Sequence, residues 1–231
     1  MIRDVAPEIL DSLAEGDPDA LRNRRDIRLF NILMGNFRWF AREVEKWTNP
    51  NDRILEIGAG VGELGTYLQR SGQCAGDRRP LTGLDLWSRP AIWPVDWAWI
   101  QEDLMEFDGV CDYDVLLAGM VLHQFKDPEL ARFGSRLGPS VRVILASETS
   151  RRAIHLAQLK LAPLIGVNHV TRHDARVSVK AGFRGDELPI ALGLDPLNWA
   201  WVCCSGWLGQ YRMVAVRRAG DAPSEGLSKS V

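Results

Sequence analysis

The run ILEIGAGVGEL at residues 54–64 passes from four apolar or acidic positions into three alternating glycines. A turn cluster at 48–52 precedes it, and Leu64, Tyr67 and Leu68 follow at the spacing of one helix face. The segment therefore predicts a buried strand, a glycine loop and a helix, in that order. Such a loop turns sharply and lets a ligand lie against the backbone, next to the partly positive amino end of the helix.

The acids around this loop indicate which ligand fits. A dinucleotide fingerprint would place its third glycine where this chain has Glu63, and a carboxylate there repels a pyrophosphate. Glu56, at the tip of the strand, suits an ammonium or sulfonium group. Asp85 ends the second predicted strand and can accept hydrogen bonds from ribose hydroxyls, while Asp103 follows the third and can accept from the amine of adenine. These acids predict a positively charged nucleoside and disfavour a nicotinamide oxidoreductase.

Strand-like and helical runs alternate along the chain, which predicts an α/β fold with a Rossmann-like, doubly wound and mostly parallel seven-stranded sheet. The predicted strands are 53–57, 81–86, 98–101, 113–117, 141–146, 198–203 and 210–217. The predicted helices after the glycine loop are 128–137, 151–164, 178–183 and 187–192. Two prolines and four tryptophans within residues 86–100 argue against a helix there and favour an apolar cover for the sheet.

Three regions are expected along the chain. Residues 1–50 form an N-terminal helical extension or lid, whose apolar residues predict a helix over 18–47 with a break at Gly35–Asn36. Residues 51–218 form the ligand-binding domain, with a substrate-facing insertion near 165–195, and 219–231 form a flexible tail.

Composition excludes several classes of protein. The 231 residues hold 28 Lys+Arg against 30 Asp+Glu, a net charge of -2 that leaves no basic footprint for nucleic acid. The least charged stretch, 196–211, is too short and too polar for a membrane span, and the acidic start lacks the pattern of a signal peptide. The four cysteines form no C-x-x-C pair, and no spacing of His, Cys and Asp predicts a metal site. We therefore expect a cytoplasmic protein with no metal and no nucleic-acid partner.

Taken together, the motifs over residues 52 to about 217 resemble those of the class I S-adenosylmethionine-dependent methyltransferases. ILEIGAGVG is similar to the first motif of that family, LDL with Asp85 to its second-strand acid, and QEDL with Asp103 to its adenine-side motif. YDVLLAGMVLHQF at 113–125 resembles a fourth-strand motif of small-molecule enzymes that ends in L-H-H-F, with Gln124 in place of the second histidine.

The resemblance implies S-adenosylmethionine as cofactor and S-adenosylhomocysteine as product. Trp87 is close enough to Asp85 in sequence to pack on the adenine face. The residues expected to hold the cofactor are Glu56, Gly58, Gly60, Gly62, Asp85, Trp87, Asp103, Leu104 and Gly119.

Two histidines are candidates for contact with the acceptor or removal of its proton. His123 follows the fourth strand near the expected methyl position, and His173 forms a His-Asp pair with Asp174 in the insertion. A purely structural role is the competing interpretation of each. The expected acceptor is a small, hydrophobic or aromatic molecule, with oxygen favoured over carbon and nitrogen as the methylated atom. The alternative is a cofactor-binding module that has lost turnover and acts through a partner; the acceptor, the base and the oligomeric state stay open.

Overall fold

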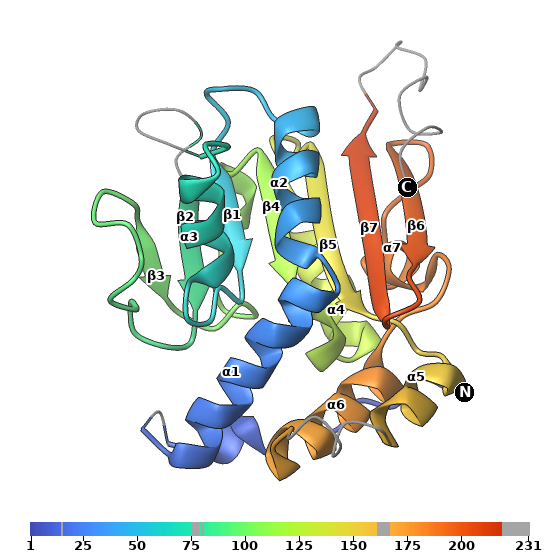
Figure 1. The fold of residues 1–231 in the computed structure, drawn as a ribbon. Coiled ribbons are helices and arrows are strands. Elements are labelled where there is room, and N and C mark those ends of the chain that lie inside the picture. Colours follow the sequence, from blue (N-terminus) through green and yellow to red (C-terminus); the bar gives the residue numbers. More distant parts are fainter. Residues whose placement is uncertain (15, 75–78, 80, 161–166, 219–231) are drawn as a thin grey trace.

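The computed structural model describes residues 1–14, 16–74, 79, 81–160 and 167–218, so the predicted tail at 219–231 lies outside it. Within these residues one seven-stranded sheet has the order β3-β2-β1-β4-β5-β7-β6 (Figure 1). Five strands pair in parallel, and β7 runs antiparallel to both of its neighbours, as the predicted mostly parallel α/β fold requires. The strands are β1 Ile54–Ile57, β2 Leu81–Asp85, β3 Trp99–Gln101, β4 Val115–Gly119, β5 Val143–Thr149, β6 Trp199–Ser205 and β7 Gln210–Arg217.

Helices cover both faces of the sheet and the carboxyl ends of its parallel strands (Figure 1). The α-helices are α1 Pro18–Leu33, α2 Asn36–Trp47, α3 Glu63–Arg70, α4 Asp127–Ser135, α5 Ala153–Gln158, α6 His169–Ala181 and α7 Glu187–Ala191. Short 3-10 turns are η1 Leu10–Ser12, η2 Gly109–Asp112 and η3 Leu122–Gln124. In Figure 1, α2 and α3 lie on one face, α4 and α7 lie on the other, and α1 and α6 lie below the strand ends.

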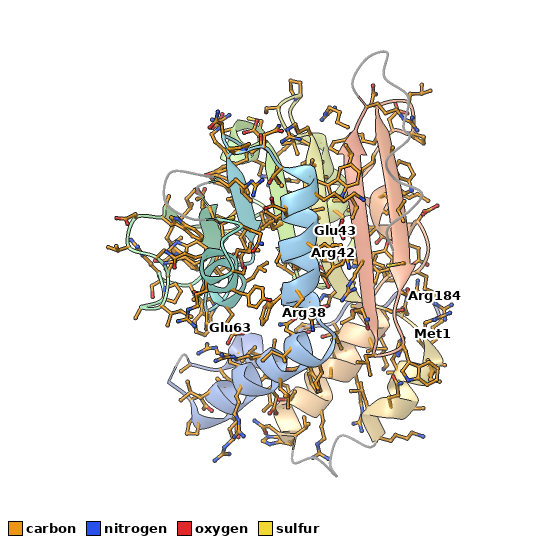
Figure 2. The ribbon with its side chains drawn as sticks, turned by 45° about the horizontal axis from the view of Figure 1, so that its top comes forward. Met1, Arg38, Arg42, Glu43, Glu63 and Arg184 are labelled. Carbon is orange, nitrogen blue, oxygen red and sulfur yellow. The ribbon has the colours of Figure 1, made fainter. Side chains whose placement is uncertain are left out.

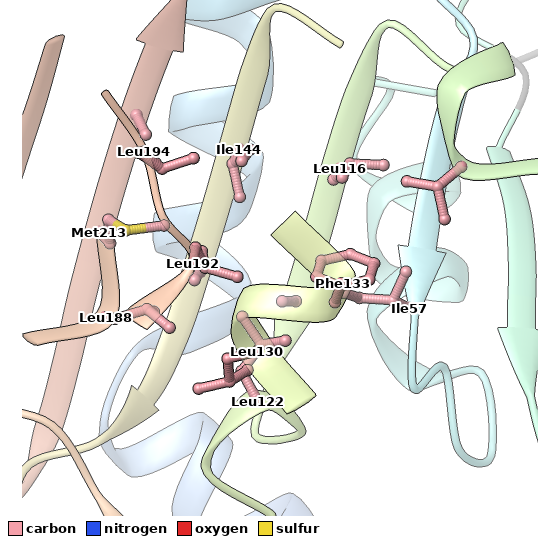
Figure 3. Packing of buried hydrophobic residues seen from close by; sticks show 14 of the residues in the cluster. Ile57, Leu116, Leu122, Leu130, Phe133, Ile144, Leu188, Leu192, Leu194 and Met213 are labelled. Atoms are coloured by element: carbon pink, nitrogen blue, oxygen red, sulfur yellow. The ribbon is translucent and has the colours of Figure 1, made fainter. Parts of the chain in front are cut away.

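The core has two apolar layers because side chains alternate between the faces of a strand. Leu55 and Ile57 of β1 point to the layer that holds Phe133 of α4 and Leu188 of α7 (Figure 3). Ile54 points to the opposite layer, together with Trp39 of α2 and the side chains of α3. Alternation places Glu56 on the same side as Ile54, so its carboxyl group lies under the amino end of α3.

The break predicted between the first two helices is confirmed. Pro18 occupies the first turn of α1, and the carboxylate of Asp17 accepts a hydrogen bond from the backbone N–H of Asp19, which caps that helix. Gly35 separates α1 from α2 with a φ of 67°, a left-handed conformation that glycine adopts without strain. Arg212 of β7 donates to the backbone oxygen of Met34 and fixes the break against the sheet.

One sequence prediction about helices is wrong. Residues 1–14, 16 and 17 are not helical apart from η1, and the first long helix begins at Pro18, as predicted. The helix predicted at 178–183 instead begins at His169, where the side chain of Asn168 caps it, and ends at Ala181. Its buried face includes Thr171, Asp174 and Ser178, and a hydrophobic pattern does not detect a face made of polar residues.

Residues 86–98 contain no helix, as predicted, and Trp93 and Trp97, with Trp99 of β3, pack in the apolar layer on the side of α2 and α3. Trp93 makes edge-on contacts with Trp97 and Trp99, with ring centroids 5.7 and 5.1 Å apart. The indole N–H of Trp93 donates to the backbone oxygen of Ala98. The prediction that these three tryptophans cover an apolar face is confirmed.

Candidate functional site

A cavity of about 900 Å³ opens at the carboxyl ends of β1, β2 and β4. Ligands of open α/β sheets bind at this edge of the sheet. The glycine loop and the tip of β2 form one end of the cavity, and the loop after β4 forms its middle. Residues of α1, α2, α6 and the N-terminal segment complete the lining.

The glycines of the loop have different roles. Gly58 and Gly60 line the cavity with φ angles of 64° and 55°, which favour glycine. A Cβ on Gly60 would meet nothing within 4 Å, so its backbone faces open space in which a ligand can lie. Gly62 does not line the cavity: a Cβ there would lie 2.9 Å from the ring of Trp93. Its place in the structure indicates packing where the sequence predicted a cofactor contact.

The acids predicted at the ends of β2 and β3 lie at the same end of the cavity. Asp85 accepts hydrogen bonds from the backbone N–H groups of Gly60 and Trp87, at 2.7 and 3.0 Å. Asp103 is exposed, and one of its oxygens accepts from the N–H of Met105 at 2.8 Å. Leu104 beside it is buried and also lines the cavity.

Trp87 lines the cavity and forms a cation–π contact with α1. The guanidinium carbon of Arg24 lies 4.1 Å from the centre of a Trp87 ring. Because α1 belongs to the N-terminal region, this contact brings that region against the end of the cavity that the glycine loop and β2 form.

Glu63 adds a further acid to this end. Figure 2 shows it at the start of α3, on the side that faces α1. Its carboxylate lies 3.5 Å from the guanidinium of Arg28, and burial raises its pKa despite the opposing effect of Arg28. A carboxylate that lines the cavity beside the loop does not suit a pyrophosphate.

Glu56 is the most perturbed acid of the cavity. Its side chain is buried, and among the described residues Oε2 has no hydrogen-bond partner. Burial, and then the negative charge of Asp85, raise the pKa of Glu56 to about 8. A buried acceptor without a donor is costly, so the site favours a ligand that brings a donor or a positive charge.

His123 lies in η3 and is buried between two carboxylates. Its Nδ1 lies 2.6 Å from Oε2 of Glu148 on β5, and its Nε2 lies 3.6 Å from Oε1 of Glu8. Glu148 is itself fully buried and accepts from the backbone N–H groups of Val121 and Leu122. Burial alone would lower the pKa of His123, but the hydrogen bonds and charges of Glu148 and Glu8 outweigh it and raise the pKa to about 9.

Gly119, at the end of β4, lines the cavity next to this histidine. Met120 follows with a φ of 60°, a conformation that is costly for a residue with a side chain. The backbone N–H of Met120 donates to the oxygen of Ser147, which holds it there. No residue pattern in the sequence predicts this strained position.

His173 lies elsewhere. It is on α6 with a half-exposed side chain, 3.1 Å from Asp174, and it does not line the cavity. The segment that holds it is helical and lines the cavity through other residues, so the role predicted for His173 has no support from the position of its side chain. The helix turns Asp174 inward in its place, and this carboxylate lines the cavity and accepts from the amide of Asn23.

Two residues of the site, Glu8 and Asn23, were not predicted. Glu8 lines the cavity from the N-terminal segment. Asn23 also lines it, and among the described residues its amide oxygen is buried without a hydrogen-bond partner. Nothing local in the sequence indicates these positions, since the residues that they contact in the cavity are more than a hundred residues away in the chain.

Two negative findings concern the described part of the chain only. It contains no group of three or more His, Cys, Asp or Glu residues that could hold a metal ion. None of its helices is long and apolar enough to cross a membrane.

The sequence matches no protein-family model and no curated protein. Solved structures do resemble the fold. The plantazolicin methyltransferase BpumL in complex with SAH matches with a TM-score of 0.65 and 13% identity, over 88% of this chain and 92% of its own. The plantazolicin methyltransferase BamL, with a triazolic desmethylPZN analog and SAH, gives a TM-score of 0.64 and 10% identity, over 90% and 92%.

A third neighbour is magnesium protoporphyrin IX methyltransferase from Synechocystis PCC 6803 with bound SAM. It matches with a TM-score of 0.50 and 14% identity, over 91% of this chain and 88% of its own. These likenesses show that the chain has the Rossmann-like fold that these methyltransferases share.

Proposed function

We propose that this protein is an S-adenosylmethionine-dependent methyltransferase that acts on a small, largely apolar or aromatic acceptor, most favourably at oxygen. One observation carries the proposal. A single cavity joins the acids at the ends of β2 and β3 to His123, and Glu56 lines it between them with an oxygen, Oε2, that has no hydrogen-bond partner among the described residues.

The cofactor end of the cavity fits the donors of an adenosyl ligand. Asp103 and Trp87 would hold adenine, Asp85 the ribose hydroxyls, and Glu56 the ammonium group of the amino acid part. Gly60 leaves room for the ligand, while the absence of a side chain at Gly58 makes room for Val121; Gly119 would border the sulfur end of the ligand. The cofactor, when bound, supplies a methyl group that the positive sulfur has already activated.

The acceptor end combines a base with apolar walls. Ile27, Phe30 and Phe37 line the cavity from α1 and α2 and can exclude water from the reacting groups. Glu148 fixes Nδ1 of His123, so that Nε2 is the nitrogen directed toward Glu8 and the acceptor side. The neutral form of His123 would take the proton of an acceptor hydroxyl at Nε2 while the oxygen accepts the methyl group.

The pKa of His123 suits an aromatic hydroxyl. At a pKa of about 9, this histidine lies close to the value of about 10 that is typical of a phenol, so the proton transfer is nearly balanced. At pH 7 only a small fraction of His123 is unprotonated, so the rate should rise as the pH approaches 9. An apolar aromatic alcohol therefore fits both the walls of the cavity and its base.

Calorimetric titration with S-adenosylmethionine, S-adenosylhomocysteine and NAD tests the cofactor part of the proposal. Binding of both adenosyl ligands and not of NAD is expected. The protein would then be incubated with methyl-tritiated S-adenosylmethionine and a panel of phenols, carboxylic acids and amines. Label in a phenol supports the proposal; binding without transfer to any of them would favour a binding module, and binding of NAD alone would contradict the proposal.

A further inference from the structure

Residues 1–12, which are not helical before η1, form a strap across the acceptor end of the cavity. The guanidinium of Arg3 anchors one part of it, with hydrogen bonds to the backbone oxygens of His123, Phe125 and Ala181 and an ion pair to Asp127. Met1 is held by Arg151, and Figure 2 shows Met1 near Arg184, away from α1.

The other part of the strap is anchored by α6. The backbone N–H groups of Ile9 and Leu10 donate to the two carboxylate oxygens of Asp174, at 2.8 and 3.1 Å. The amide of Asn23 on α1 donates to the same carboxylate. Glu8 lies between the anchors at Arg3 and Asp174, so the fold sets the position of its side chain.

Glu8 is directed at the catalytic histidine proposed above. Its carboxylate lies 3.6 Å from Nε2 of His123 and accepts a hydrogen bond from the hydroxyl of Ser178. Its side chain is only 9% exposed. Burial would raise the pKa of Glu8, but the hydrogen bond and charge of His123, with the hydroxyl of Ser178, outweigh burial and lower it. The carboxylate is therefore ionised and close enough to stabilise a proton on Nε2.

Other charged groups surround this pair. Glu148 of β5 contacts the opposite nitrogen of His123, and Asp174 of α6 lines the same cavity. Arg3 of the strap, which is paired with Asp127 of α4, lies against the backbone of the histidine loop. Arg151, after β5, is paired with Glu187. Among the described residues, Glu8 and Glu148 are the acids that contact the imidazole itself.

We propose that Glu8 is a positioning residue for methyl transfer: the strap holds its carboxylate against Nε2 of His123, so that this nitrogen keeps a proton and becomes a base only when that proton leaves. The meaning of this contact for catalysis rests on the proposed function. The contact itself does not, because it can be measured in the free protein.

The two nitrogens of the imidazole ring then have separate roles. Glu148 orients the ring through Nδ1, while Glu8 controls the proton on the nitrogen that faces the acceptor side. An opposite charge within 4 to 6 Å shifts a pKa by about 1 to 3 units. In Glu8→Gln, the pKa of His123 should therefore fall from about 9 by about 1 unit or more.

A lower pKa of His123 would change the pH dependence of the rate, which the loss of a purely structural contact would not do. At pH 7, a pKa of about 9 leaves about 1% of His123 neutral, and a pKa of about 8 leaves about 10%. If His123 is the base, Glu8→Gln should raise kcat/KM at pH 7 by up to about tenfold and move the alkaline plateau of the rate toward neutral pH. Loss of strap anchoring alone would lower the rate at every pH.

Histidine titration by NMR in the full-length protein tests the proposal without acceptor or cofactor. With histidine labelled by ¹³C at Cε1, the four histidines of the chain give four signals, and His123→Gln identifies the one of interest. The wild type, Glu8→Gln and a control, Glu106→Gln, would be titrated from pH 5 to 10. Glu106 is an exposed partner of Arg132 outside the cavity, so its variant should leave the His123 titration unchanged.

A lower pKa of His123 in Glu8→Gln, with no change in Glu106→Gln, supports the proposal. An unchanged pKa in a folded Glu8→Gln, as judged by circular dichroism, would overturn it. Should Glu8→Gln not fold, Ser178→Ala provides a second test, because it removes the hydroxyl that donates to Glu8, along with its bond to the backbone oxygen of Asp174, and should also change the His123 titration. Absence of methyl transfer would count against the proposed function and leave the titration result standing.

Discussion

Binding of an adenosyl ligand should release a proton from Glu56. With a pKa of about 8, about 0.9 of this carboxyl group is protonated at pH 7. An ammonium group beside it should lower the pKa by about 2 units, to about 6, where about 0.1 stays protonated. Binding at pH 7 should therefore release about 0.8 proton, and the affinity should increase about fivefold from pH 6 to pH 7.

Calorimetry in buffers with different ionisation enthalpies measures this proton release directly. The observed binding enthalpy should depend on the buffer for S-adenosylhomocysteine in the wild type, and the dependence should disappear in Glu56→Gln. A suitable control is Glu102→Gln, because Glu102 lines the same cavity with an exposed side chain and should leave the release unchanged. Binding with no proton release in the wild type, or with equal release in Glu56→Gln, would refute the role of Glu56 as the partner of the ammonium group.

Further predictions concern the base, the ribose acid and the fold. His123→Gln should lower kcat by about 10²- to 10⁴-fold and leave the affinity for S-adenosylhomocysteine nearly unchanged. In the wild type, kcat/KM should rise about tenfold per pH unit below pH 9. A flat pH profile would contradict a base at this position. Asp85→Ala should weaken S-adenosylhomocysteine binding roughly 10- to 100-fold in calorimetry, since hydrogen bonds to a charged group are worth about 1.5 to 3 kcal/mol; wild-type affinity would exclude the ribose role. Gly134→Ala should destabilise the protein by about 1 to 3 kcal/mol in urea unfolding, because the new Cβ would overlap the backbone oxygen of Leu192. The control Gly16→Ala, whose new Cβ would meet nothing within 4 Å, should have nearly the stability of the wild type. Equal stabilities of the two variants would show that α4 and α7 do not pack as described.

The cofactor end of the cavity could be predicted from sequence because its signals are local. Glu56 and Asp85 lie near or at the end of a short strand-like run and Asp103 follows one, and the ends of parallel strands meet at one edge of the sheet. His123 was found in the same way, from its position after the fourth strand. Spacing could not separate Gly60, which faces the cavity, from Gly62, which packs against Trp93 from a different part of the chain.

The acceptor end depends on contacts that no local pattern encodes. Glu8 reaches His123 across more than a hundred residues, and the acidic start of the chain gave no sign of this contact. The inward face of α6 carries Asp174 and Ser178, whose partners are backbone and side-chain groups of the strap. Because these residues are buried through hydrogen bonds, hydrophobic periodicity missed the face and misplaced His173.

A crystal structure of the protein with S-adenosylhomocysteine would show directly where the ligand binds. We expect the ligand in the cavity, with adenine at Asp103, ribose at Asp85, the ammonium group at Glu56 and the sulfur directed toward His123. An empty cavity at saturating ligand, or a ligand bound away from these acids, would contradict this expectation.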